Sequence, residues 1–314
     1  MTVRVLTPAV EAIGDAKALL GESVFYDPAS NTLHWVDIPG HALLSTDASD
    51  GRTKRFPFPE PAGFTQPCSD GQLLVGQADS IQRFDPRTEA ATTFIKIEPD
   101  DPTSRTNDAV CDHNGRLIAG TMRSAPQGTT PDPVGNLYRI DGGGAKSCLL
   151  SGLSIPNGLA FSPDGRTLYL ADTPRRTVWK AGYDPETGLP GERCVFVELS
   201  ESQGRPDGAA VDAEGCYWVA AVWGRQLLRY TPRGDLDLVV RLPVERPTKL
   251  AFGGPDHRTI YVTSASIHLT DPENQPFAGR LIALDVGITG LPASPFHADD
   301  KGGGGKPGAC KPGV

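Results

Sequence analysis

Short apolar segments recur along this chain at nearly regular intervals. Six of them share a pattern of apolar, β-branched and aromatic residues that is typical of buried strands. Most of the six begin after a turn in which Asp or Asn precedes Gly, because these residues adopt the backbone angles that tight turns require. The six segments span residues 31–37, 71–77, 115–121, 166–172, 215–221 and 258–264.

A second apolar segment follows each of the six, and most of these are succeeded by another turn and a further apolar stretch. The second segments span residues 41–47, 79–85, 135–141, 176–182, 225–231 and 279–285. A repeat of about 40–50 residues with about four strands is the signature of a β-propeller blade. Six repeats therefore predict an all-β protein, a six-bladed β-propeller that forms a single domain over residues 1–296. A β-sandwich or a β-solenoid is the alternative.

Both ends of the chain depart from the repeat. We expect the stretch before Glu22 to add a strand to the last blade and close the ring, which removes exposed sheet edges. Residues 297–314 are rich in Gly and Lys and have nothing to bury. We expect them to form a disordered tail with the composition of an artificial extension.

Composition and charge exclude several classes of protein. The 314 residues include 36 Gly and 29 Pro, but 38% are hydrophobic, which favours a turn-rich folded chain over a disordered one. The net charge of −8 comes without a basic block, which argues against nucleic-acid binding. No run approaches the ~18 apolar residues of a membrane-spanning helix, and the N-terminus lacks a secretory signal. We expect a cytoplasmic monomer or weak oligomer whose partner is a small molecule, with no nucleic-acid or membrane partner.

One position of the repeat concentrates polar residues. In a propeller, the chain entering the innermost strand of each blade points at the central axis, so equivalent positions of different blades converge. About ten residues before the third residue of each of the six segments, four blades carry an oxygen-bearing side chain: Glu22, Asn107, Asn157 and Asp207. Arg105 lies two residues before Asn107.

These side chains suit a metal ion. Glu22, Asn157 and Asp207 supply two carboxylates and one amide oxygen, the ligands preferred by a hard divalent cation such as Ca²⁺, Mn²⁺ or Mg²⁺. Zn²⁺ and Fe²⁺ remain alternatives, although they usually take nitrogen or sulfur ligands. The competing interpretation is that Asn and Asp before Gly are simply turn formers.

The other two blades place Ala62 or Gly63 and Lys249 at the same position. We expect Lys249 to be a charge on the rim of the site. No G-x-S-x-G motif supports a nucleophilic serine, and no histidine occupies an axial position.

Five motifs, in this order, resemble the senescence-marker-protein/gluconolactonase family, which includes regucalcin and luciferin-regenerating enzyme. They are LGESVFYDPASNTLHWVDI (20–38), RTNDAVCDHNGRLIAGTM (105–122), IPNGLAFSPDGRTLYLADT (155–173), RPDGAAVDAEGCYWVAAVWG (205–224) and PTKLAFGGPDHRTIYVTSA (247–265). The resemblance covers nearly the whole chain except the tail. It departs after Met122, where Arg123 and Ser124 stand and some members carry a Glu that contacts the substrate. The resemblance therefore implies a class of substrate and no particular sugar.

The resemblance implies a six-bladed propeller that binds one divalent metal ion through Glu22, Asn157 and Asp207. It also implies that Arg105 and Asn107 contact the substrate, which in this family is the lactone of a sugar acid. Asp207 is the candidate general base towards water, in addition to its role as a ligand.

The sequence thus favours a metal-dependent sugar lactonase that opens an aldonolactone to the aldonic acid. Two alternatives remain open: a non-catalytic propeller that binds calcium or a small molecule, and a metal-dependent hydrolase of another ester. The guanidinium of Arg105 favours catalysis, because a protein that only binds cations has no need of a positive charge there.

Overall fold

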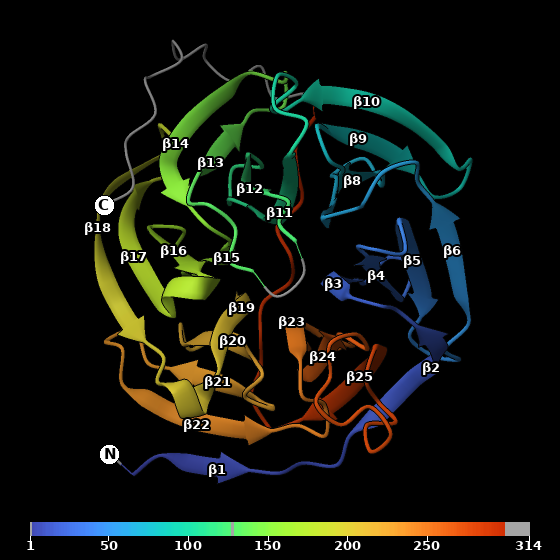
Figure 1. Cartoon of the computed structure of the whole chain (residues 1–314), viewed down its shortest axis with the longest axis vertical. Coiled ribbons are helices and arrows are strands. Elements are labelled where there is room, and N and C mark those ends of the chain that lie inside the picture. Colours follow the sequence, from blue (N-terminus) through green and yellow to red (C-terminus); the bar gives the residue numbers. More distant parts are fainter. Residues whose placement is uncertain (1, 127–128, 299–314) are drawn as a thin grey trace.

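Six sheets surround a central axis in the computed structural model, which describes residues 2–126 and 129–298 (Figure 1). Five blades have four strands and one has five, which confirms the all-β, six-bladed propeller. From the axis outward, blade one consists of β3 (Gly21–Asp27), β4 (Thr32–Asp37), β5 (Ala42–Asp47) and β6 (Thr53–Pro57). Blade two consists of β7 (Phe64–Pro67), β8 (Leu73–Gly76), β9 (Ser80–Asp85) and β10 (Ala90–Lys96). Blade three consists of β11 (Ser104–Cys111), β12 (Leu117–Arg123), β13 (Gly135–Ile140) and β14 (Lys146–Leu153).

The other three blades repeat this order. Blade four consists of β15 (Pro156–Phe161), β16 (Thr167–Asp172), β17 (Thr177–Asp184) and β18 (Leu189–Glu198). Blade five contains β19 (Arg205–Val211), β20 (Tyr217–Val222), β21 (Gln226–Tyr230) and β22 (Leu236–Arg241). Blade six consists of β23 (Pro247–Gly253), β24 (Thr259–Ser264), β25 (Arg280–Asp285) and β2 (Glu11–Lys17). Two 3-10 turns, Thr173–Arg175 and Glu201–Gln203, interrupt the connections. No helix in the described part of the chain is long and apolar enough to cross a membrane.

The N-terminal segment closes the ring. Strand β2 pairs antiparallel with β25, so the first strands of the chain complete the last blade, as the sequence predicts. Strand β1 (Arg4–Leu6) was not predicted and adds a fifth strand to blade five, parallel to β22. These pairings tie the start of the chain to two different blades.

Apolar side chains fill the wedges between neighbouring blades. Between blades four and five, Tyr169 and Tyr217 lie with ring centroids 4.8 Å apart, and Tyr217 is fully buried. Between blades five and six, Trp218 meets Phe252 edge-on at 5.9 Å. Because each cluster draws on two blades, burial of these apolar surfaces holds the blades in fixed relative positions.

The C-terminal segment crosses one end of the central channel. Gly290 bridges to Asp212 in blade five, and Phe296 bridges to Cys68 in blade two. The backbone N–H of His297 then donates to the carbonyl of Gly115 in blade three at 3.0 Å. His297 and Ala298 therefore belong with the propeller, and the rest of the expected tail, 299–314, lies outside the described residues.

Candidate active site

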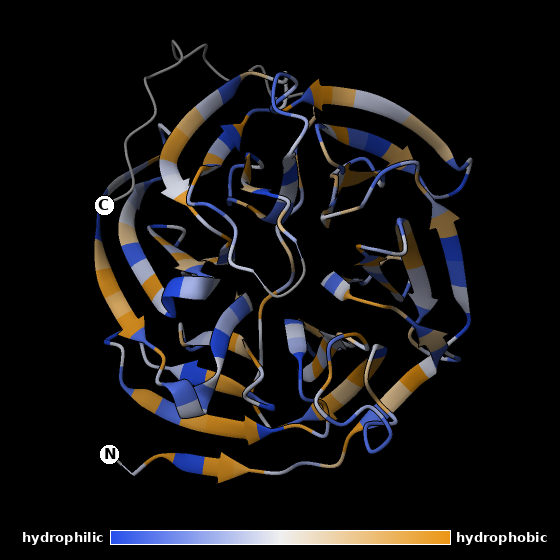
Figure 2. Ribbon diagram, in the orientation of Figure 1, coloured by the Kyte–Doolittle hydropathy of each residue, from blue (hydrophilic) through white to orange (hydrophobic). Residues whose placement is uncertain are grey.

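The predicted site residues lie on the innermost strands rather than on the loops that lead into them. Five of the six innermost strands lose register with their neighbour at or beside the axial position, for example between Glu22 and Phe25 in β3 and between Asn157 and Ala160 in β15. Such irregularities re-aim side chains. Figure 2 shows hydrophilic residues at the axial ends of β3, β19 and β23.

Hydrogen bonds join four of the predicted residues in one chain. The Nη1 of Arg105 donates to Oδ1 of Asn107 at 3.0 Å, and Nδ2 of Asn107 donates to Oδ1 of Asn157 at 2.8 Å. The Nδ2 of Asn157 in turn donates to Oδ1 of Asp207 at 2.7 Å and to Oγ1 of Thr173 at 2.8 Å. Residues from blades three, four and five therefore meet at the axis, as their common repeat position predicts.

Gly158 lets the backbone bring Asn157 to this place. Its φ is +64°, and a Cβ there would lie 2.6 Å from Oη of Tyr217 and 2.8 Å from Cβ of Ala171. Only glycine fits this conformation in this space. The turn that the sequence suggested at Asn157 is thus a bend within β15 that serves the site.

Glu22 and Asp207 are buried carboxylates without a direct ion pair, although the charge of Lys249 acts on both. Neither forms an ion pair within the described residues. Burial and the neighbouring charges of Asp207 and Asp108 raise the pKa of Glu22 well above its usual range. Burial and then the charge of Asp108 raise the pKa of Asp207 to about 7. The charges of Arg246, Lys249 and Arg105 offset the rise in the pKa of Asp207 only in part. A cation between the two desolvated carboxylates would therefore stabilise them as anions.

The oxygen atoms present fit a hard divalent cation. Oδ1 of Asn157 accepts one hydrogen bond and keeps a second lone pair, and no hydrogen bond reaches Oδ2 of Asp207 among the described residues. No group of three His, Cys, Asp or Glu that could hold a metal occurs in the described residues, so nitrogen- or sulfur-rich sites are not offered. Two carboxylates and one amide match oxygen-preferring ions.

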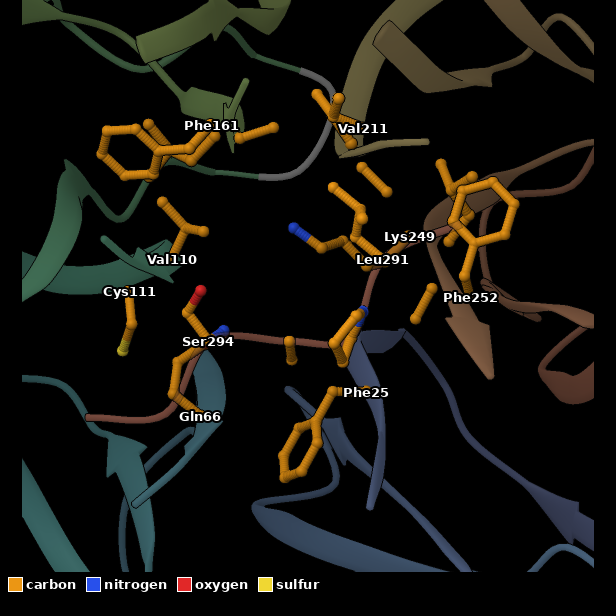
Figure 3. Close-up of a pocket in the computed structure, with 18 of the residues that line it drawn as sticks. Phe25, Gln66, Val110, Cys111, Phe161, Val211, Lys249, Phe252, Leu291 and Ser294 are labelled. Carbon is orange, nitrogen blue, oxygen red and sulfur yellow. The ribbon is translucent and has the colours of Figure 1, made fainter. Parts of the chain in front are cut away.

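Lys249 is not the rim charge that the sequence suggested. It is buried, and its Nζ lies 3.0 Å from Oδ1 of Asp108, in a pair whose side chains are 8% and 6% exposed. Figure 3 shows Lys249 pointing into a cavity of 380 Å³, below the site, that the C-terminal residues Leu291 and Ser294 also line. Buried cations need a partner, and Asp108 on the opposite blade supplies it.

A larger hollow of 1020 Å³ opens on the other side of the site. Arg105 lines it together with Arg205, Arg246 and the exposed Trp223. Sequence reasoning missed Arg205 and Arg246. A signal for Arg205 was present, since it stands two residues before Asp207 as Arg105 stands two residues before Asn107.

A family model described as "SMP-30/Gluconolactonase/LRE-like region" matches residues 20–266, and so covers every predicted site residue. The chain belongs to this family. Among its SMP-30/gluconolactonase relatives is a 6-deoxy-6-sulfogluconolactonase of Pseudomonas putida, 33% identical over 90% of this chain and 96% of the relative. A pentonolactonase of Haloferax volcanii is 35% identical over 92% of this chain and 98% of its own.

A solved structure of the SMP-30/gluconolactonase family has the same architecture. The calcium-binding regucalcin of Agrobacterium tumefaciens superposes with a TM-score of 0.88 at 31% identity, over 94% of this chain and 99% of that one. The family resemblance inferred from the five motifs is therefore confirmed in both sequence and fold.

Proposed function

We propose that this protein is a divalent-metal-dependent lactonase that hydrolyses the lactone of a sugar acid to the open acid. The observation that carries the proposal is the pair of buried carboxylates Glu22 and Asp207, which repel each other. Asp207 is linked through Asn157 to the donors Asn107 and Arg105. The relatives named as lactonases support a sugar lactone as the substrate class. The calcium-binding neighbour supports a divalent cation.

Glu22, Asn157 and Asp207 would hold the cation, which when bound supplies Lewis acidity towards a carbonyl and lowers the pKa of water. One oxygen of Asp207 is fixed by Asn157, which leaves the other free to accept a proton. The pKa of about 7 describes Asp207 without a cation, and a bound cation would lower it.

Hydrolysis then follows from the placement of the donors. The water oxygen bonds to the carbonyl carbon of the lactone while Asp207 takes the water proton. The ring C–O bond then breaks, and the proton returns to the departing ring oxygen. Within the described residues, only Nη1 of Arg105 donates hydrogen bonds, to the carbonyl of Thr106 and to Oδ1 of Asn107. The other N–H groups of Arg105 are free to stabilise negative charge on the substrate.

The test is proton release from a panel of pentono- and hexonolactones, using chelator-treated protein with Ca²⁺, Mn²⁺, Mg²⁺, Zn²⁺ or Fe²⁺ added back. We expect at least one lactone to be hydrolysed, and Glu22→Gln and Asp207→Asn to lower kcat by about 100-fold or more, because each removes an ionic ligand. Glu201→Gln is the matched control, since Glu201 stands exposed at the mouth of the hollow.

Hydrolysis no faster than the uncatalysed rate with every cation would contradict the lactonase proposal. If the protein still binds a cation in that case, measured by calorimetry, it is a non-catalytic binding propeller. Full activity of Asp207→Asn with metal bound would remove Asp207 from the role of base.

A further inference from the structure

Three arginines around the hollow lack a carboxylate partner. Arg105, Arg205 and Arg246 all line the hollow above the carboxylates, and none forms an ion pair with any described residue. Guanidinium groups carry five donors and are matched most often by carboxylate or phosphate oxygens. The chain has a net charge of −8, but these cations, which form no ion pair, give this one opening a positive charge.

Trp223 fixes two of these arginines in place. The guanidinium carbons of Arg205 and Arg246 lie 5.4 Å and 4.7 Å from the centroid of the same indole ring. Trp223 itself has a φ of +62°, a conformation that bulky residues rarely adopt, and 46% of its surface is exposed. Strained residues of this kind concentrate at ligand sites, and the cation–π contacts hold the two charges close together.

Arg246 is short of hydrogen-bond acceptors. Its residue surface is only 9% exposed, its Nη1 donates to the carbonyl of Ile267 at 2.7 Å, and its buried Nε has no partner among the described residues. Burial also lowers the pKa of Arg246. A desolvated cation with an unused donor is costly to the free protein, and an anionic ligand would relieve that cost.

The charges of the site do not balance without a further anion. The charges of Glu22 and Asp207 act on Arg105 and Arg246. A divalent cation bound by these two carboxylates would neutralise them and leave the guanidinium groups with an excess of positive charge. Lactone hydrolysis itself generates one negative charge, first on the carbonyl oxygen and then on the product carboxylate, and Arg105 stands beside Asn107 to meet it. Arg205 and Arg246 form no hydrogen bond to Asn107, Asn157 or Asp207 among the described residues, although the charge of Arg246 acts on Asp207.

We propose that the substrate is a sugar lactone bearing a second anionic group on the carbon chain remote from the lactone carbonyl, and that Arg205 and Arg246 bind this group. A carboxylate, a sulfonate or a phosphate monoester presents the same charged oxygens to a guanidinium pair. This inference rests on the proposed lactonase function and specifies its substrate class.

The experiment compares D-glucono-lactone with its 6-phosphate, its 6-deoxy-6-sulfonate and its 6-carboxylate counterpart, with metal-loaded protein at equal ionic strength. We expect kcat/KM for at least one anionic lactone to exceed that of the neutral one by about tenfold or more, mainly through KM. Raising the salt concentration should weaken this preference, because exposed charge interactions are screened.

Variants locate the preference within the hollow. Arg205→Gln and Arg246→Gln should each lower the ratio of kcat/KM, anionic over neutral, by about tenfold or more, and Arg246→Lys should restore part of it. The matched control is Arg176→Gln. Arg176 lines the same hollow, but Glu201 already pairs with it at 3.1 Å, so the ratio should stay within about twofold.

A second measurement is independent of catalysis. Calorimetric titration of wild-type protein with 6-phosphogluconate and with gluconate should show tighter binding of the phosphorylated acid, and Arg246→Gln should abolish the difference. Equal turnover of neutral and anionic lactones, with no change of ratio in the variants, would overturn this inference and leave the lactonase proposal standing. Absence of turnover for every lactone would instead overturn the lactonase proposal.

Discussion

Lys249 and Asp108 form an ion pair across the central axis, with Nζ of Lys249 3.0 Å from Oδ1 of Asp108. The two residues come from blades six and three and are separated by 141 positions in the sequence. Oδ1 of Asp108 also accepts a hydrogen bond from the backbone N–H of Ala109, and Oδ2 accepts one from the backbone N–H of Leu159. The pair therefore joins opposite blades where the remaining axial groups are carboxylates and amides.

Lys249→Met should lower the free energy of unfolding by about 3 kcal/mol, because it leaves the charge of Asp108 buried and unpaired. Urea denaturation of the metal-free protein measures the change. The double variant Asp108→Asn with Lys249→Met should be more stable than Lys249→Met alone, since neither charge is then stranded. An unchanged urea midpoint in Lys249→Met would show that the pair contributes little.

Asp207→Asn should stabilise the metal-free protein at pH 8 by roughly 2 kcal/mol, while it abolishes activity. The pKa of Asp207 is raised to about 7 in the folded state, so the folded protein holds its proton at a pH where the unfolded chain has lost it. Stability is therefore lost as pH rises from about 4 to about 7. The gain from Asp207→Asn should be absent at pH 4 and present at pH 8, by urea denaturation in chelator.

His34 should make the protein less stable in mild acid. Burial lowers its pKa to about 4, and its Nδ1 lies 2.8 Å from Oγ of Ser45. The unfolded chain takes up a proton near pH 6.5 and the folded protein only near pH 4, so stability falls across that window by about 3 kcal/mol. The variant His34→Gln should flatten this part of the stability profile. An equally steep profile in the variant would assign the acid sensitivity to other groups.

Gly158→Ala should lower both stability and kcat, because the new Cβ would collide with Tyr217 and Ala171 and displace the neighbouring Asn157. We expect a loss of about 2–3 kcal/mol and at least a tenfold fall in kcat. Gly71→Ala is the matched control. Gly71 also has a positive φ, +81°, but a Cβ there would meet nothing within 4 Å. Gly71→Ala should therefore lower the free energy of unfolding by only about 1 kcal/mol and leave kcat unchanged.

The sequence predicted the blades well because their signals are local. The apolar segments of each repeat became strands at the expected places, and the shared repeat phase brought Asn107, Asn157 and Asp207 together at the axis. The three-residue strand β1 escaped prediction because Arg4–Leu6 is too short and too exposed to show a period. Its pairing with β22 depends on where the closed ring leaves the N-terminus.

The missed features of the site depend on contacts between distant segments. Asp108 follows Asn107 in what reads as an ordinary turn, and only the folded ring brings Lys249 to it. Arg246 lies outside the repeat position used for the search, and its proximity to Arg205 arises through Trp223. The irregular register of the innermost strands is set by hydrogen bonding between strands, which no single segment reveals.

The pairing of β2 with β25 has a consequence for biosynthesis. Residues 11–17 leave the ribosome well before their partner, Arg280–Asp285, because five blades lie between them in the sequence. Blade six therefore cannot assemble during translation of the earlier blades. Until it does, β2 lacks its backbone partner, and the flanks of the open ring expose the apolar side chains that would pack against blade six. The slow step of folding should be this final closure, in which β2, made early and unpaired until then, pairs with β25, made late.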